Sequence, residues 1–433
     1  MLRRIIKPIV LSNADRWQAL TTCADLIRGN QSIQEAFAQL QVNSVLDEPP
    51  AEGNETPTTH NGIPKVYVID GLLDLTLSVP IHTAFDSRLA ACQCIKAYFF
   101  NHQVIRKHFL RRAIEGHASG ADETANVLTT LLQPLDSHSS GDPYRYWFAA
   151  VILFHLIFEE PAAKVLAMSV AEGDASTGEE VVTCIQTITA NLVTGIQKNA
   201  DERVLVAYLM LLCGWLFEDP DAVNDFLGEG SNLSGLVQAV LQISGGGAIV
   251  SGLCAMLLGI VYEFSTKDSP VPRATIHSIL ASQLGRDQYI DRMTKLRAHP
   301  LLRDFEVLPQ KLGPASLGGL PEVFFDRSFV DFVKDNFSRL LRAIDRDPGM
   351  EIPIVANGVQ KGISREMVDS LRSQLEEKEK ALQKSEEDVI SYQRQLEQEQ
   401  SDHRRNKEMA AVEIARIKNV NDSLQRHHEE ETK

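Results

Sequence analysis

The sequence predicts an all-α protein, an armadillo- or HEAT-like α-solenoid followed by a long coiled-coil helix. Residues 204–217 are hydrophobic all round, which is typical of a helix covered on nearly every side by other helices. The run is too short to cross a bilayer, which takes ~20 apolar residues. Residues 364–433 contain no Pro or Gly and carry an apolar residue at almost every seventh position, which predicts a coiled coil.

The bulk composition agrees with this fold class. A chain of 433 residues has room for two or three domains, and 44% hydrophobic residues are typical of a globular protein. Strand-forming runs of alternating Val, Ile, Thr and Tyr are nearly absent. The net charge of −15 argues against an extended nucleic-acid surface, because phosphate binding favours a basic stripe.

The start of the chain and the placement of the cysteines indicate the cellular compartment of the protein. The first eight residues are too short and too interrupted to form a secretory signal. All six cysteines lie inside apolar helical patterns, which favours buried thiols in a reducing compartment over a disulfide framework. We therefore expect a soluble, cytoplasmic protein. The cysteines are Cys23, Cys92, Cys94, Cys184, Cys213 and Cys254.

The chain opens with helices over residues 1–42, the first capped near Asn13 and ended by Gly29. It begins on an amphipathic helix with no lead-in, so we expect the head to be shortened at its N-terminus. Residues 43–64 are rich in Pro, Gly, Asn, Thr and Glu and are expected to form a flexible surface insertion. Further helices are predicted at 65–79, 87–100, 102–115, 124–132, 144–158, 161–171 and 179–196.

An internal repeat supports the solenoid. Phe158-Glu159-Glu160-Pro161 and Phe217-Glu218-Asp219-Pro220 lie 59 positions apart, and each closes an apolar helix and opens a shorter one. Phe100-Asn101 ends a similar helix 58 positions before Phe158. A period in the forties, lengthened by loop insertions, is typical of armadillo and HEAT arrays.

The C-terminal third divides into three parts. Helices are predicted at 273–284, 287–299 and 324–344, with a Gly/Pro linker over 308–321. We therefore assign the head to residues 1–345, a hinge to 346–363 and the coiled coil to 364–433.

The coiled coil has one good seam and one weak seam. Eight of nine a positions counted from Val368 are apolar, whereas most d positions are polar. We expect a homodimer, and no cap or stop signal ends the helix, so the rod is expected to continue in a longer parent. The predicted dimer seam consists of Val368, Leu371, Leu375, Leu382, Val389, Tyr392, Leu396, Ile417, Val420 and Leu424.

A basic cluster is the main candidate interaction site in this acidic chain. It allows two interpretations, a solvated helix face or a contact surface for an acidic partner or for anionic lipid headgroups. The cluster consists of Arg88, Lys96, Arg106, Lys107, Arg111 and Arg112.

No catalytic, cofactor-binding or metal-binding residue is predicted. Cys92 and Cys94 face different sides of a helix and have no second ligand pair nearby. Gly245–Gly247 lacks the strand and the Lys-Ser/Thr of a phosphate loop. His155 lies in an apolar helix and is interpreted as a core histidine with its hydrogen bonds satisfied, rather than a general base.

Four segments in order resemble the globular head of the general vesicular transport factor family, the dimeric tethers of ER-to-Golgi traffic. These are Leu209–Leu216, Gly252–Gly259, Gly285–Tyr289 and Phe325–Lys334. The resemblance covers roughly residues 1–345 and implies an armadillo-type head and parallel dimerisation through the rod. It also implies peripheral association with Golgi and transport-vesicle membranes, and partnership with a Rab-type GTPase, SNAREs and golgins.

The resemblance also has limits. The family's head begins upstream of Met1, and its long rod and acidic tail continue past Lys433. We therefore expect a chain truncated at both ends, without the golgin-binding tail.

The functional prediction is a non-enzymatic vesicle tether. The alternative is an armadillo-type cargo adaptor or carrier that binds extended peptides. Such carriers present Trp and Asn at regular spacing along a groove, whereas this chain has only Trp17, Trp147 and Trp215, two of them in apolar helices. A helical-repeat enzyme, the third class, has no catalytic constellation in its favour.

Overall fold

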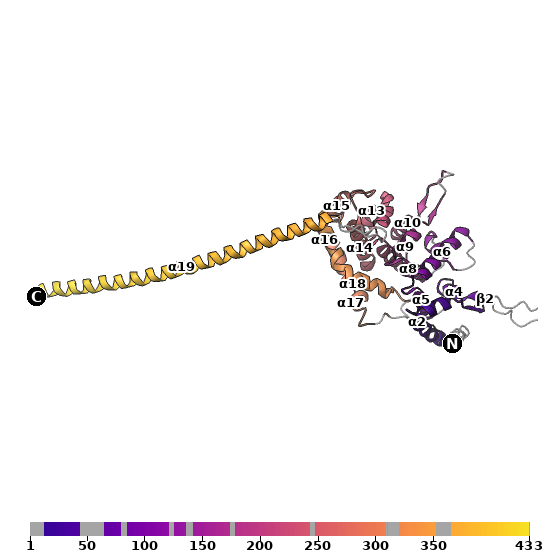
Figure 1. Ribbon diagram of the computed structural model, residues 1–433, viewed down its shortest axis with the longest axis horizontal. Coiled ribbons are helices and arrows are strands. Elements are labelled where there is room, and N and C mark those ends of the chain that lie inside the picture. Colours follow the sequence, from indigo (N-terminus) through magenta and orange to yellow (C-terminus); the bar gives the residue numbers. More distant parts are fainter. Residues whose placement is uncertain are drawn as a thin grey trace, which may run out of the picture. The chain divides into compact units, whose positions relative to one another are not determined.

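The structure, a computed structural model, describes most of the chain (Figure 1). It separates into two compact units, Met1–Val359 and Gln360–Lys433, which are described one at a time. The described residues are 13–43, 65–78, 85–120, 125–135, 142–173, 178–242, 247–308, 310, 320–351 and 365–432.

The first unit is an all-α solenoid of four stacked three-helix layers. In each layer a long inner helix (α5, α8, α11 or α14) packs against the helix before it and leads into the next. The predicted armadillo-like fold is confirmed. The layers are α4 (Val68–Leu77), α5 (Phe85–Phe99) and α6 (Gln103–Ser119); α7 (Val127–Leu132), α8 (Pro143–Ile157) and α9 (Pro161–Met168); α10 (Cys184–Gln197), α11 (Glu202–Leu216) and α12 (Pro220–Gly228); α13 (Gly230–Gln242), α14 (Ala248–Phe264) and α15 (Arg273–Ile279).

Further helices flank the four layers. Before them, α2 (Asn13–Ile27) packs on α5, and α3 (Gln31–Ala38) follows it. After them come the π-helix η2 (Leu280–Leu284), α16 (Arg286–Ala298), α17 (Pro300–Arg303), α18 (Arg327–Leu341) and the 3-10 helix η3 (Ala343–Asp345).

The inner helices form the core. The side chains of α11 from Val204 to Leu216 are all buried, as its uniform hydrophobicity predicts. Tyr208 donates a hydrogen bond to the Leu131 carbonyl at 3.1 Å, which satisfies its buried hydroxyl. Gly214 allows close packing of the inner helices, because a Cβ there would lie 2.2 Å from the Phe154 ring. All six cysteines are buried and free, as predicted.

Two short antiparallel hairpins interrupt the helices. β1 (Gln41–Asn43) pairs with β2 (Lys65–Tyr67), so the helix predicted from Lys65 begins instead at Val68. Residues 44–64 of the predicted insertion lie outside the described residues.

The second hairpin pairs β3 (Ala171–Glu172) with β4 (Val182–Thr183), where the sequence predicted a loop and then a helix from Glu179. That prediction was wrong about the helix start. A capping box between Thr183 and Gln186 starts α10 at Cys184.

The second unit is α19, a continuous helix of 67 residues from Arg365 to Glu431 (Figure 1). At 1.5 Å per residue it is on the order of 100 Å long. Within the described part of the chain, no helix combines the length and apolar character that a membrane span requires.

Candidate functional site

Three equivalent corners join the inner helices to the helices that follow them. At each corner an aromatic residue is followed by a residue in the left-handed conformation: Asn101 (φ 52°), Glu159 (φ 55°) and Glu218 (φ 54°). This conformation reverses the chain within one residue, and it is uncommon for a side chain such as Glu. The repeated motif in the sequence therefore marks the corners of successive layers, which follow Phe100, Phe158 and Phe217.

A polar side chain from one layer holds the corner of the next. Gln34 donates to the Phe100 carbonyl at 2.9 Å, Arg106 to that of Phe158 at 3.2 Å and Lys164 to that of Phe217 at 2.8 Å. The last carbonyls of a helix have no partner within it, so these donors satisfy groups that would otherwise be orphaned. Two of these three donors, Arg106 and Lys164, are cations.

Lys164 is unusual because it is buried. Burial lowers the pKa of its ammonium to about 8, although Asp219, 3.9 Å away, and Glu218 favour the charged form. Asp219 also caps α12 by accepting a hydrogen bond from the Ala222 amide at 3.0 Å. The Lys164 ammonium therefore donates to the corner carbonyl and pairs with one carboxylate.

Helix α18 lies across these corners, and a buried ionic cluster fixes its start. Asp326 caps the helix by accepting from the Ser328 amide at 3.0 Å, forms an ion pair with Lys96 and lies 2.9 Å from Nε2 of His155. Burial opposes ionisation of Asp326, but Lys96 and His155 outweigh it and hold its pKa well below the usual range. Burial and the Lys96 charge lower the pKa of His155.

The middle and end of α18 are anchored on the corners as well. The Phe332 ring packs edge-on against those of Phe158 and Phe217, with centroid distances of 5.6 and 5.0 Å. Arg339 pairs with Glu218 at 2.9 Å and with the buried Glu263 at 3.0 Å.

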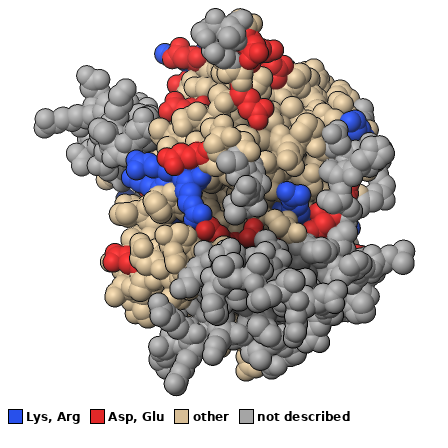
Figure 2. Space-filling view, turned by 90° about the vertical axis from the view of Figure 1, so that its right-hand side faces the viewer, with Lys and Arg blue, Asp and Glu red and all other residues tan. Residues whose placement is uncertain are grey.

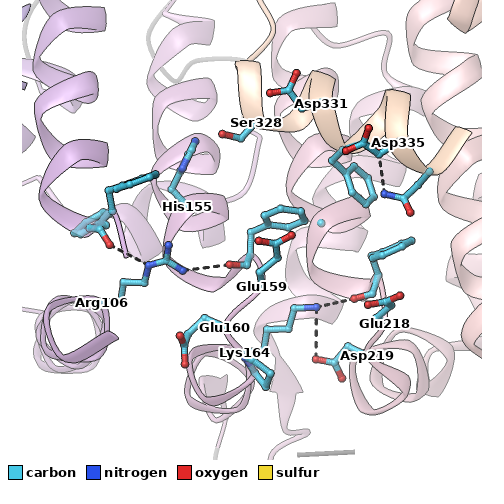
Figure 3. A pocket seen from close by; sticks show the side chains of 18 of the residues that line it. Arg106, His155, Glu159, Glu160, Lys164, Glu218, Asp219, Ser328, Asp331 and Asp335 are labelled. Atoms are coloured by element: carbon cyan, nitrogen blue, oxygen red, sulfur yellow. Dashed lines mark hydrogen bonds and ion pairs between the residues drawn. The ribbon is translucent and has the colours of Figure 1, made fainter. Parts of the chain in front are cut away.

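A groove of about 1070 Å³ remains between α18 and the corners, and we call it the corner groove (Figure 3). Ser328, Asp331 and Asp335 on α18 form one wall, and Glu159 and Glu218 belong to the wall facing it. Between them lie apolar surfaces of the corner phenylalanines and of Val165, which is 53% exposed. Acidic side chains therefore stand on both walls of the groove, whose lining also includes apolar surface and the cations Arg28, Lys96, Arg106, Lys164, Arg327 and Arg339.

The structure places the residues of the predicted basic cluster in different environments. Arg88 and Lys96 are 0% and 7% exposed, so the prediction that they belong to a contact patch was wrong. Arg88 donates to the Thr76 carbonyl and pairs with Asp142 at 2.7 Å, because its helix face turns into the core. Lys96 is held by Asp326.

The remaining members of the cluster lie on α6. Arg106 is half-buried at the corners, and Arg112 pairs with Asp70 at 2.6 Å. Within the described residues, Lys107 and Arg111 alone of the cluster form neither an ion pair nor a side-chain hydrogen bond, and Arg111 is exposed. On the face shown in Figure 2, Lys and Arg side chains form small groups beside Asp and Glu rather than a continuous basic surface.

The minor candidates keep a structural role. Cys92 and Cys94 are buried, and no group of three or more potential ligands among the described residues could hold a metal ion. Most of Gly245–Gly247 lies outside the described residues. His155 has a partner in Asp326, which confirms its interpretation as a hydrogen-bonded core histidine.

The predicted dimer seam lies along α19. Seven of its described side chains are exposed to solvent in the single chain: Leu382, Val389, Tyr392, Leu396, Ile417, Val420 and Leu424. The side chains of Val368, Leu371 and Leu375 lie outside the described residues.

Comparisons with known proteins agree with this architecture. A family model described as the head region of Uso1/p115-like vesicle tethering proteins matches residues 30–344. Intracellular protein transport protein USO1 of Saccharomyces cerevisiae is 27% identical over 399 residues, which cover 82% of this chain and 22% of the yeast protein. General vesicular transport factor p115 of Bos taurus is 26% identical over 330 residues, which cover 76% of this chain and 31% of the bovine protein.

Solved structures give the same result. The crystal structure of Uso1-2 is similar with a TM-score of 0.66 and 28% sequence identity, over 78% of this chain and 50% of that one. The chain thus spans less than a third of the length of the yeast and bovine relatives.

Proposed function

Since the chain belongs to the family of Uso1/p115-like vesicle tethering proteins, we propose that it acts as a non-enzymatic tether of transport vesicles in ER-to-Golgi and intra-Golgi traffic. The match of the family model over residues 30–344 carries this proposal. The related proteins are named as intracellular protein transport and vesicular transport factors.

The proposed mechanism combines the two units. Two α19 helices pair along the exposed apolar stripe and bring two solenoid heads onto one dimer. Linking the heads raises the effective concentration of the second contact into the millimolar range, so that weak contacts hold a vesicle. The exposure of Leu382, Leu396 and Ile417 in a single chain supports this proposal.

The proposed partners follow from the family. They are a Rab-type GTPase and SNAREs, with peripheral association on Golgi and transport-vesicle membranes. Among the basic residues, we propose only Lys107 and Arg111 as a partner or lipid contact, since the others are buried or paired.

The two tryptophans of the apolar helices give the carrier alternative no support. Trp147 and Trp215 are 1% and 0% exposed, so neither can contact a peptide. The Trp147 indole donates instead to the Phe324 carbonyl at 2.7 Å.

A vesicle-bridging assay tests the tether. Golgi-derived vesicles labelled with two dyes are mixed with the chain, and two-colour clusters are counted. We expect clusters with the natural chain, and loss of clustering without loss of vesicle binding when Leu382→Asp and Leu396→Asp are combined. Matched substitutions off the stripe, Gln383→Asp with Gln398→Asp, should leave clustering intact. A natural chain that neither binds nor clusters vesicles would contradict the proposal.

A further inference from the structure

We propose that the corner groove is a docking site for an extended segment of a partner protein that carries lysine or arginine side chains. This inference goes beyond tethering, because it concerns one head by itself and needs neither a membrane nor a second chain.

The cations that line the groove are already engaged. Lys96 is paired with Asp326, and Arg339 with Glu218 and Glu263. Arg106 and Lys164 donate to the corner carbonyls described above. The remaining two, Arg28 and Arg327, lie over the rings of Phe100 and Phe305, at 5.4 and 5.9 Å from their centroids.

Several carboxylates of the groove are not engaged in this way. Glu159, Asp221, Asp331 and Asp335 line it, are exposed, and form no ion pair within the described residues. Among the exposed side chains of the lining, these four acids outnumber the two arginines Arg28 and Arg327, so the field inside the groove favours a positive charge. The same field disfavours phosphate groups, so neither an anionic lipid surface nor a nucleic acid fits this site.

The geometry suits a polypeptide. Asp331 and Asp335 are four residues apart and therefore share one face of α18, opposite Glu159 on the corner side, and Asp221 also lines the groove. Successive side chains of an extended segment point to opposite sides, so one segment can reach both acidic walls at once. Its apolar stems would lie on Phe158, Phe217 and Val165, because Lys and Arg bury their methylene groups while keeping the charge in a polar setting.

A metal ion is the other ligand that acidic rows could attract. No group of three or more His, Cys, Asp or Glu side chains in the described residues is close enough to hold one. The carboxylates are spread along the groove, which fits several cationic side chains rather than one ion.

Fluorescence anisotropy of a labelled peptide tests the proposal. The probe is a short peptide of alternating lysine and threonine, titrated with the full chain at low salt. Combining Asp331→Asn with Asp335→Asn should weaken binding about fivefold, because two partly exposed ion pairs are lost. Glu159→Gln with Asp221→Asn should weaken it by a similar factor. Added salt should also weaken binding, since exposed charges are screened.

The controls separate the groove from general attraction to an acidic chain. Glu115→Gln with Asp287→Asn removes the same charge from exposed positions outside the groove and should leave the affinity unchanged. A peptide with glutamate in place of lysine should not bind. An equal loss in the control variant, binding of the glutamate peptide, or no binding of the lysine peptide would each overturn the inference.

The outcome is independent of the tether test. The combined Leu382→Asp and Leu396→Asp chain should bind the peptide as the natural chain does, because the groove lies within one head. Circular dichroism melts of the groove variants should match that of the natural chain, since the substituted side chains are exposed.

Discussion

The solenoid head and α19 differ in the exposure of their apolar side chains. Leu209 in the inner helix α11 is 0% exposed, whereas Leu396 in α19 is 56% exposed. In the head the layers cover one another, so the inner helices are buried within a single chain. In α19 the described side chains of the apolar stripe are exposed in the single chain. The head is therefore expected to fold independently of concentration, and α19 to depend on a second copy.

The largest expected effect tests whether α19 depends on a second copy of the chain. Leu382→Asp combined with Leu396→Asp places charges at two predicted a positions, where a dimer would bury them without partners. We expect complete conversion from dimer to monomer by analytical ultracentrifugation, with no change in the thermal unfolding of the head. The off-stripe control Gln383→Asp with Gln398→Asp should remain dimeric. An unchanged dimer for the seam variant would refute this seam.

The second prediction tests whether the head also depends on charge. Asp326→Asn keeps an oxygen that can cap α18 but leaves Lys96 buried without its counter-charge. Breaking a buried ion pair in this way costs about 3–5 kcal/mol, so the head should melt at a markedly lower temperature. Adding Lys96→Met should restore most of the loss. A single variant as stable as the natural chain would contradict a stabilising ion pair between Asp326 and Lys96.

The third prediction measures how tightly the layers pack. Gly214→Ala places a methyl group 2.2 Å from the Phe154 ring, so the head must shift or strain. We expect a destabilisation of about 1–3 kcal/mol in urea denaturation. Gly71→Ala in α4 is the matched control, because nothing lies within 4 Å of its added methyl group. That change should be neutral or stabilising by up to about 1 kcal/mol, through helix propensity.

The same comparison explains what the sequence could predict. The layers could be predicted from short-range patterns, because the all-apolar helices and the repeated Phe-Glu-x-Pro corners are each encoded by residues that are close together in the sequence. The corner groove could not, because it depends on α18 crossing those corners. No local pattern pairs Asp326 with Lys96, which is 230 positions away.

The error at Arg88 and Lys96 has the same origin. A cation within a helix is normally solvated, and only the tertiary arrangement supplies Asp142 and Asp326 as buried partners. The repeated motif marked the positions of the corners in the sequence. It did not indicate that the corner residues adopt the left-handed backbone conformation, which would have pointed to the groove. The dimer seam stays a prediction from the heptad pattern.

The smallest predicted effect concerns pH and is confined to the head. Burial lowers the pKa of His155 in the folded chain below its ordinary value of 6.5. The unfolded chain therefore takes up the proton first as the pH falls, so this group removes stability below about pH 6.5. Asp326 does not oppose this trend between pH 7 and 5, because its pKa lies far lower in the folded chain.

His155→Gln keeps a donor for Asp326 and removes the titrating group, so the melting temperature should fall less between pH 7 and pH 5 than it does in the natural chain. The change in slope is at most about 1.4 kcal/mol per pH unit, the contribution of one proton. His108→Gln, at an exposed position on α6, is the matched control. Equal slopes for the natural chain and His155→Gln would mean that folding leaves the pKa of His155 unchanged, which would contradict the prediction.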